Sequence, residues 1–135
     1  MNYWENSYFC ALPYLIKIVM AAAAEVQAFL EAFKAKLGVW GVVFRDDRGK
    51  NAQALLSLEI TPAQRQAVLQ ELQQADYCQG PLEEKLYGGA DMWVFGKMIK
   101  GQEVYIKITT GLLGAQVICI SFHLAEHPLS YPLKT

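Results

Sequence analysis

Three runs of β-branched and aromatic residues near the C-terminal end of the chain constrain its fold more than any other feature. They cover residues 92–99, 102–110 and 116–124, and only Lys100 and Gly101 separate the first two. A two-residue connection that contains glycine is typical of a β-hairpin, and a short glycine-containing loop joins the second run to the third. The pattern predicts an antiparallel meander of three strands.

The faces of this meander follow from its first turn. A two-residue turn pairs Phe95 with Ile106, and this register gathers the apolar residues on one side of the sheet. We expect the core face to hold Trp93, Phe95, Val104, Ile106, Ile108, Ile118, Ile120 and Phe122. We expect the opposite face to hold Val94, Met98, Glu103, Tyr105, Lys107, Thr109, Cys119, Ser121 and His123.

Two amphipathic helices are predicted before the meander. Apolar residues recur at three- and four-residue steps over residues 22–37, and this helix is expected to end at Gly38. Thr61 followed by Pro62 is typical of a helix start, because the hydroxyl caps free N–H groups and proline is tolerated at the first position. This second helix is expected to continue to about Gln74.

The segments between these helices are shorter. Residues 39–44 are predicted to form a strand, followed by a charged turn and a short apolar segment at 52–58, and residues 76–91 are predicted to form a long irregular connection. The overall expectation is an α+β fold in which two helices pack on one face of a small antiparallel β-meander sheet. The other face is left open.

The length of 135 residues predicts one domain. An apolar stretch near the start resembles a signal peptide, but no basic residue precedes it, Pro13 and Lys17 interrupt it, and it is too short to span a bilayer. We therefore interpret residues 1–19 as a dispensable extension from a misplaced start codon, and residues 20–135 as the domain. Export and membrane attachment are not expected.

Charge and cysteine content narrow the function classes. Twelve Lys and Arg residues nearly balance thirteen Asp and Glu residues, so no global positive field attracts nucleic acid. Cys10, Cys78 and Cys119 are widely spaced, which favours free thiols in a reducing cytoplasm. His123 and His127 stand four residues apart without the glutamate of a helical zinc motif, so we expect no metal and no cofactor.

The polar face of the meander carries the residue types that metal-free RNA cleavage needs. That reaction requires a base for the 2′-hydroxyl, an acid for the leaving 5′-oxygen and a cation beside the phosphorane. His123, Tyr105 and Lys107 supply these types, and a lysine beside a tyrosine is expected to lower the pKa of the phenol. The same alternation of residues is also typical of a solvated sheet face, which is the competing interpretation.

A family resemblance adds to this interpretation. Residues 91–95, 101–109 and 117–122 resemble the C-terminal half of MqsR-type toxins, and a looser resemblance extends over residues 22–124. These toxins are bacterial mRNA interferases of toxin–antitoxin systems. The resemblance implies a compact RelE-like α+β fold, metal-independent cleavage of mRNA and inhibition by a cognate antitoxin protein.

The resemblance also assigns roles to individual residues. The family's catalytic tyrosine, within a Gly-Gln-x-Val-Tyr-x-Lys pattern, corresponds to Tyr105, and the lysine of that pattern corresponds to Lys107. This chain differs from the family at three positions. His123 and Gln79 each stand where the family has a lysine, and Val94 stands where it has a glutamine. Histidine preserves proton transfer, whereas the other two replacements leave fewer groups to hold the phosphate.

The sequence is therefore compatible with two functions. The first is a toxin-type endoribonuclease in which Tyr105 and His123 act as acid and base and Lys107 stabilises the scissile phosphate. Its candidate substrate-binding residues are Lys97, Gln79 and Trp93. The second is a non-catalytic protein-binding domain that uses the same sheet face, and the net charge of −1 favours it because many RNA-cleaving toxins are basic.

Overall fold

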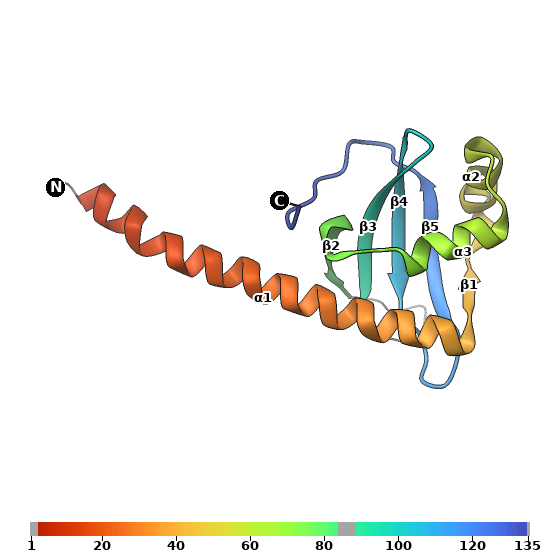
Figure 1. Cartoon of the computed structure of the whole chain (residues 1–135), viewed down its shortest axis with the longest axis horizontal. Coiled ribbons are helices and arrows are strands. Elements are labelled where there is room, and N and C mark those ends of the chain that lie inside the picture. Colours follow the sequence, from red (N-terminus) through yellow and green to blue (C-terminus); the bar gives the residue numbers. More distant parts are fainter. Residues whose placement is uncertain (1–2, 84–88, 135) are drawn as a thin grey trace.

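The computed structural model describes residues 3–83 and 89–134, with side chains from residue 22 onward apart from that of residue 48. Over these residues the chain forms three α-helices and one five-stranded sheet, which is an α+β fold (Figure 1). The helices are α1 Tyr3–Trp40, α2 Lys50–Leu58 and α3 Pro62–Gln70, with short 3₁₀ turns η1 Asp46–Arg48 and η2 Gln74–Asp76. The strands are β1 Val42–Phe44, β2 Tyr77–Leu82, β3 Met92–Ile99, β4 Gln102–Thr109 and β5 Val117–Leu124.

The sheet is mixed, and its strand order is β1-β5-β4-β3-β2. The predicted meander is present as β3, β4 and β5, which pair antiparallel. The purely antiparallel sheet is a wrong prediction, because β1 pairs parallel with β5 at one edge, and β2 adds an antiparallel strand at the other. β1 can run parallel to β5 because most of the chain lies between them and returns β5 in the same direction.

The predicted register of the first hairpin is confirmed. Phe95 pairs with Ile106, and Trp93 pairs with Ile108. The turn residues Lys100 and Gly101 have φ values of 49° and 79°, so both are left-handed. A two-residue turn with two left-handed residues matches the right-handed twist of the flanking strands, which is why this connection fixes the pairing.

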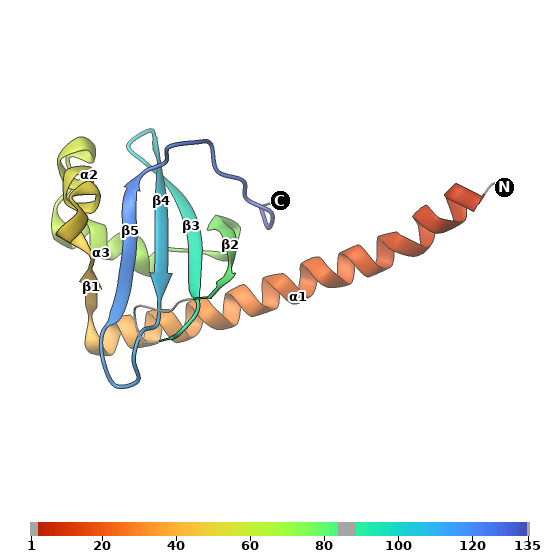
Figure 2. The same ribbon diagram turned by 180° about the vertical axis from the view of Figure 1, so that it is seen from behind.

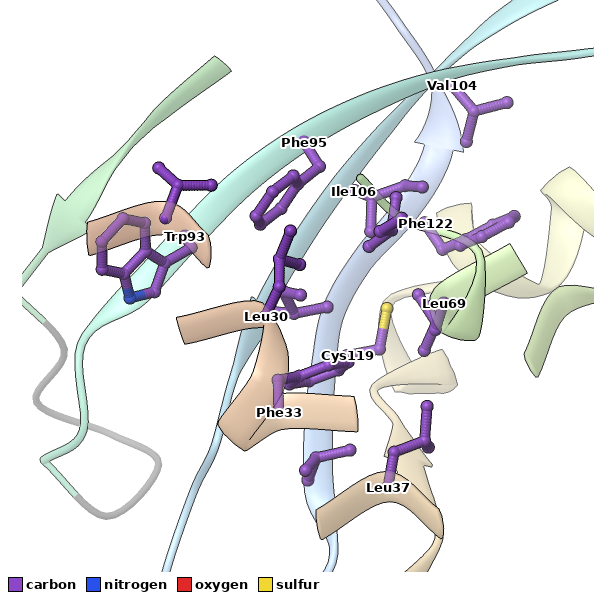
Figure 3. Close-up of a cluster of buried hydrophobic side chains, with 14 of the residues drawn as sticks. Leu30, Phe33, Leu37, Leu69, Trp93, Phe95, Val104, Ile106, Cys119 and Phe122 are labelled. Atoms are coloured by element: carbon purple, nitrogen blue, oxygen red, sulfur yellow. The ribbon is translucent and has the colours of Figure 1, made fainter. Parts of the chain in front are cut away.

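α1 and α3 cover one face of the sheet, and the core lies between these helices and the strands, whereas α2 stands beside β5 at the β1 edge (Figures 1 and 2). Figure 3 shows side chains of α1 and α3 meeting those of β3, β4 and β5. The largest fully buried side chains there include Leu30 and Phe33 of α1, Leu69 of α3, and Phe95, Ile106 and Phe122 of the sheet. Their spacing in α1 follows the three- and four-residue pattern of the sequence, which explains why this face of the helix is buried.

α1 is longer at both ends than predicted. It begins at Tyr3, runs through Gly38 and ends at Trp40, and its N-terminal half extends away from the sheet (Figure 1). The helix ends there because Gly41, with φ of 79°, adopts the left-handed conformation and donates its N–H to Leu37 O at 2.9 Å. The dispensability of residues 1–19 stays a prediction.

α2 was not expected, so the prediction of two helices is wrong. Its buried residues are Asn51, Ala54 and Leu58, which recur at three- and four-residue steps. The sequence shows only two strongly apolar positions on this stripe, because the third is an asparagine that the structure uses for hydrogen bonding. A mixed polar and apolar stripe this short gives a weak helical signal.

α3 begins as predicted, although it ends at Gln70. Thr61 Oγ1 accepts a hydrogen bond from Gln64 N at 3.1 Å, and Gln64 Oε1 accepts one from Thr61 N at 2.8 Å. This reciprocal capping box satisfies two N–H groups at the start of the helix. The predicted irregular connection is also shorter, because residues 77–82 form β2, while residues 84–88 lie outside the described part of the chain.

No helix in the described part of the chain has the length and hydrophobicity needed to cross a membrane.

Candidate functional site

A β-bulge in β5 decides which side chains reach the sheet face away from the helices. His123 pairs with Tyr105 and Ser121 with Lys107, but Cys119 pairs with Ile108, so the register shifts by one residue within β5. On the N-terminal side of this bulge, the side chains of β5 therefore point to the faces opposite to those that simple alternation predicts. Cys119 is therefore fully buried among core side chains rather than beside Tyr105 (Figure 3), and Ile118 belongs to the other face; both predictions were wrong.

The side chain of Asn51 holds the bulge in place. Its amide nitrogen donates to Ile120 O at 3.0 Å and to Arg45 O at 2.7 Å, and its amide oxygen accepts from Phe122 N at 2.8 Å. A carboxamide presents one donor and one acceptor side by side, as a peptide group does. Asn51 therefore replaces the neighbouring strand where β1 has ended, and it satisfies buried backbone groups of β5.

On the C-terminal side of the bulge, where pairing with β4 is regular, Tyr105, Lys107 and His123 lie together on one face. The rings of Tyr105 and His123 are stacked, with centroids 5.3 Å apart and an interplanar angle of 17°. Lys107 Nζ lies 5.9 Å from the centroid of the Tyr105 ring. The three residue types that the sequence suggested for proton transfer and phosphate binding are thus neighbours on adjacent strands.

The backbone fixes the proton on the His123 ring. Nδ1 lies 3.0 Å from the carbonyl oxygen of Leu124, which can only accept a hydrogen bond. Nδ1 therefore carries the hydrogen, and Nε2 of the neutral ring keeps a lone pair. A histidine held in this tautomer can take a proton at Nε2.

Tyr105 does not have the lowered pKa that its lysine neighbour suggested. Burial raises the pKa of its phenol above the ordinary value, and the nearby Cys78 thiol raises it further. Desolvation is the largest cause of this shift, and the Lys107 ammonium, 5.9 Å from the ring centroid, does not outweigh it. Tyr105 therefore keeps its proton at neutral pH and is a hydrogen-bond and proton donor.

An open pocket of about 400 Å³ lies over these residues. Its lining combines the sheet with two segments that sequence reasoning did not connect to the site: the first residue of α2 and the chain after β5. The lining residues are Lys50, Tyr105, Lys107, Ser121, His123, Glu126, His127, Pro128 and Leu129. Three cationic or imidazole groups besides Lys107 thus face one cavity.

Lys50 and Glu126 close one side of the pocket with an ion pair of 2.6 Å. The pKa of the Glu126 carboxyl is lowered, first by the hydrogen bond from Lys50 and then by its charge, with smaller contributions from His123 and His127. The pair is exposed to solvent, so it contributes little to stability. Its effect is to hold a lysine ammonium at the border of the pocket.

The chain after β5 folds back over the far sheet face, which is therefore not fully open as predicted (Figure 2). Glu103 anchors this segment: its carboxylate accepts hydrogen bonds from Leu129 N at 2.9 Å and from Tyr131 Oη at 2.8 Å. Gly96 of β3 makes room for it, because a Cβ there would lie 2.7 Å from Leu129 Cδ1. The anchored segment, residues 125–134, forms one wall of the pocket; we call it the C-terminal strap.

The three predicted substrate-binding residues have different positions. Gln79 pairs with Val94, which pairs with Lys107, so Gln79 is on the same face as Lys107 and two strands away, at about 10 Å. Trp93 is only 6% exposed and stacks on Phe29 in the core. Lys97 pairs with Val104 on the helix-covered side and forms a 3.0 Å ion pair with Asp76. Trp93 and Lys97 are not part of the cluster.

The remaining nucleophilic and metal-binding groups are separate from this pocket. In the residues that the structure describes, no group of three or more His, Cys, Asp or Glu side chains is arranged to hold a metal ion. Cys78 and Cys119 are free, as predicted, and the side chain of Cys10 lies outside the described residues. Burial raises the pKa of the Cys78 thiol to about 12, so it stays protonated.

A scan against protein-family models and searches of curated proteins and of solved structures give no significant match to this chain. The site is therefore described by its own chemistry. It offers an imidazole base, a phenol that keeps its proton, and ammonium groups around a cavity, a set that suits a reaction in which an anionic substrate exchanges protons.

Proposed function

We propose that this chain is an endoribonuclease that cleaves mRNA without a metal ion. The observation that carries the proposal is the stacked pair of Tyr105 and His123 on the floor of the pocket, with Lys107 over the tyrosine ring. One residue of the pair is held in the tautomer of a base, and the other keeps its proton as an acid must. The resemblance to MqsR-type toxins supports the same reaction class.

In this proposal His123 Nε2 takes the proton of a ribose 2′-hydroxyl. The 2′-oxygen then attacks the adjacent phosphorus, the new P–O2′ bond forms, and the P–O5′ bond breaks. The 5′-oxygen leaves with its electron pair and takes the phenol proton of Tyr105, since an alkoxide is a stronger base than a phenolate. Lys107 neutralises charge on the phosphorane oxygens. The products are a 2′,3′-cyclic phosphate and a 5′-hydroxyl, and solvent returns the proton from His123 to Tyr105.

The biological role in this proposal is that of a toxin of the cytoplasm, inhibited by a cognate antitoxin protein that covers the pocket. The alternative is a non-catalytic protein-binding domain that uses the same face. Two observations favour the alternative: the net charge of −1, and the presence of Val94 and Gln79 where the resembling family has polar and basic groups.

Incubation of the pure protein with a long mRNA, with and without EDTA, separates these functions. We expect cleavage that chelation does not change, and termini bearing cyclic phosphate and 5′-hydroxyl groups. His123→Ala and Tyr105→Phe should each slow cleavage roughly 100-fold or more, the usual contribution of a positioned base or acid.

Tyr77→Phe is the matched control. Tyr77 lies on the helix-covered side, where its ring contacts Phe95 and its hydroxyl donates to Gly80 O. This variant should cleave RNA like the wild type. Uncut RNA under all conditions, or cleavage that survives both site substitutions, would overturn the ribonuclease assignment and leave protein binding as the function of this face.

A further inference from the structure

A second, smaller pocket adjoins the candidate active site on the side of α2. It has a volume of about 200 Å³ and is lined by Lys50, Gln53, Ala54, Ser57, His123, Leu124 and Glu126. Three of these residues, Lys50, His123 and Glu126, also line the larger pocket. The two pockets thus share His123 and the Lys50–Glu126 ion pair as a common border, and an extended ligand that crosses His123 reaches both.

Helix α2 builds the outer wall of the smaller pocket. Lys50, Gln53, Ala54 and Ser57 follow one another at steps of three, one and three residues, so they lie on one side of the helix. Ala54 and the partly buried Leu124 form an apolar floor, while the exposed Gln53 and Ser57 stand at the rim. Within the described residues, the side chains of Gln53 and Ser57 make no hydrogen bond, so their polar groups are available to a ligand.

We infer that the smaller pocket binds the base of a nucleotide that flanks the cleaved phosphodiester, and that Gln53 makes it prefer adenine. The inference rests on the proposed ribonuclease function. Single-stranded RNA is recognised through splayed bases, which combine an apolar ring face with a polar edge. The pocket offers the matching combination of an apolar floor and a polar rim.

The preference for adenine follows from the groups at the rim. A glutamine amide presents a donor and an acceptor together, which matches the amino group and ring nitrogen at one edge of adenine. The Ser57 hydroxyl can donate or accept and adds no preference of its own. Lys50, held at the border by Glu126, is placed to contact the phosphate that links the base to the nucleotide in the larger pocket.

Mapping of cut sites on a long, unstructured RNA tests the inference. Wild-type protein should cut with adenine enriched at one position next to the broken bond, and Gln53→Ala should reduce that enrichment about 10-fold, the scale of a lost bidentate base contact. Gln66→Ala is the matched control, because Gln66 is an exposed glutamine on α3 that lines neither pocket. Cleavage without an adenine preference, or with one that survives Gln53→Ala, would overturn the inference.

A binding measurement keeps this result separate from the ribonuclease assignment. Short oligonucleotides with 2′-deoxyribose at the cut site cannot be cleaved by 2′-hydroxyl attack, so their affinities report recognition alone. An oligonucleotide with adenine beside that site should bind about 10-fold more tightly than one with cytosine, and Gln53→Ala should remove the difference. Adenine-selective binding without cleavage of any RNA would retain the base pocket and reject the nuclease, whereas equal binding would reject the pocket.

Discussion

The two faces of the sheet are built in different ways. The helix-covered face is a continuous apolar surface in which Phe95, Ile106 and Phe122 are fully buried against α1 and α3. The other face holds the cluster of Tyr105, Lys107 and His123, which lie on strands that follow one another in the sequence. Its walls come from the start of α2 and from the C-terminal strap. The core is thus determined mainly by local patterns, whereas the candidate site depends on contacts between distant segments.

The two faces should therefore respond differently to the loss of a side chain. A core side chain contributes through the area and volume that it fills, so its removal weakens the whole fold. A site residue contributes through its position, so its removal changes chemistry with little effect on folding. Asn51 and the strap support the site, so substitutions there should have effects on stability that lie between these extremes.

The largest effect on stability is expected for Phe95→Ala. Phe95 is fully buried in the middle of the sheet, against Tyr77 and Phe29, and its truncation leaves a cavity. The free energy of unfolding should fall by roughly 3–5 kcal/mol, as measured by urea denaturation. His123→Ala on the other face should cost about 1 kcal/mol, which is the scale of a lost ring contact. Equal costs for the two variants would contradict the division between the faces.

Asn51→Leu should give the second largest effect, because it acts on both faces. The substitution keeps a similar volume but leaves Ile120 O and Phe122 N buried without their partner. Unsatisfied groups of this kind cost about 1–3 kcal/mol, and without the carboxamide the segment of β5 that carries His123 loses a hydrogen bond at the neighbouring Phe122 N–H. We expect lower stability, faster hydrogen exchange at Phe122 N–H, and weaker RNA cleavage.

Gln53→Ala, on the exposed side of the same helix, is the control for folding. It should change the free energy of unfolding by less than about 0.5 kcal/mol. If Asn51→Leu is as stable as this control, the asparagine does not hold the bulge, and the inverted faces of β5 need another cause.

The core face could be predicted because its signals are local. The Lys100-Gly101 turn sets the register of β3 and β4, and alternation then separates apolar from polar side chains. The same reasoning failed within β5, where it placed Cys119 beside Tyr105. The bulge depends on a hydrogen bond from Asn51 to a residue 69 positions away, and strand periodicity carries no sign of it.

The candidate site could be predicted only in part. Tyr105, Lys107 and His123 were found because they lie above the bulge, on the strand segments whose alternation is regular. Lys50 and Glu126 were missed because 76 residues separate them, and His127 because it follows the last strand. A signal was present in Glu103, a carboxylate on a sheet face whose partners lie in the strap, but nothing local identifies those partners.

A smaller effect than that of Asn51→Leu is expected for Tyr131→Phe, which removes one of the two hydrogen bonds that the Glu103 carboxylate accepts from the strap. The cost should be about 1–2 kcal/mol at neutral pH. Burial and the hydrogen bond to Glu103 raise the pKa of Tyr131, so the folded state retains the phenol proton more firmly than the unfolded state does. This contribution is complete below about pH 10, the ordinary phenol value, and is lost as the pH rises through the raised pKa. The stabilities of wild type and variant should therefore converge only in strongly alkaline solution.

Thr61→Ala separates the role of the strap from a general loss of stability. It removes the N-cap hydroxyl of α3, a residue that lines neither pocket, and should cost about 1 kcal/mol. This cost involves no phenol, so it should not change in alkaline solution as that of Tyr131→Phe does. RNA cleavage measured at neutral pH should fall several-fold in Tyr131→Phe, because His127 and Leu129 lose the anchor of their wall, and should be unchanged in Thr61→Ala. If both variants cleave equally well, the strap covers the sheet face without shaping the site, and the contrast between the faces then rests on β4, β5 and α2 alone.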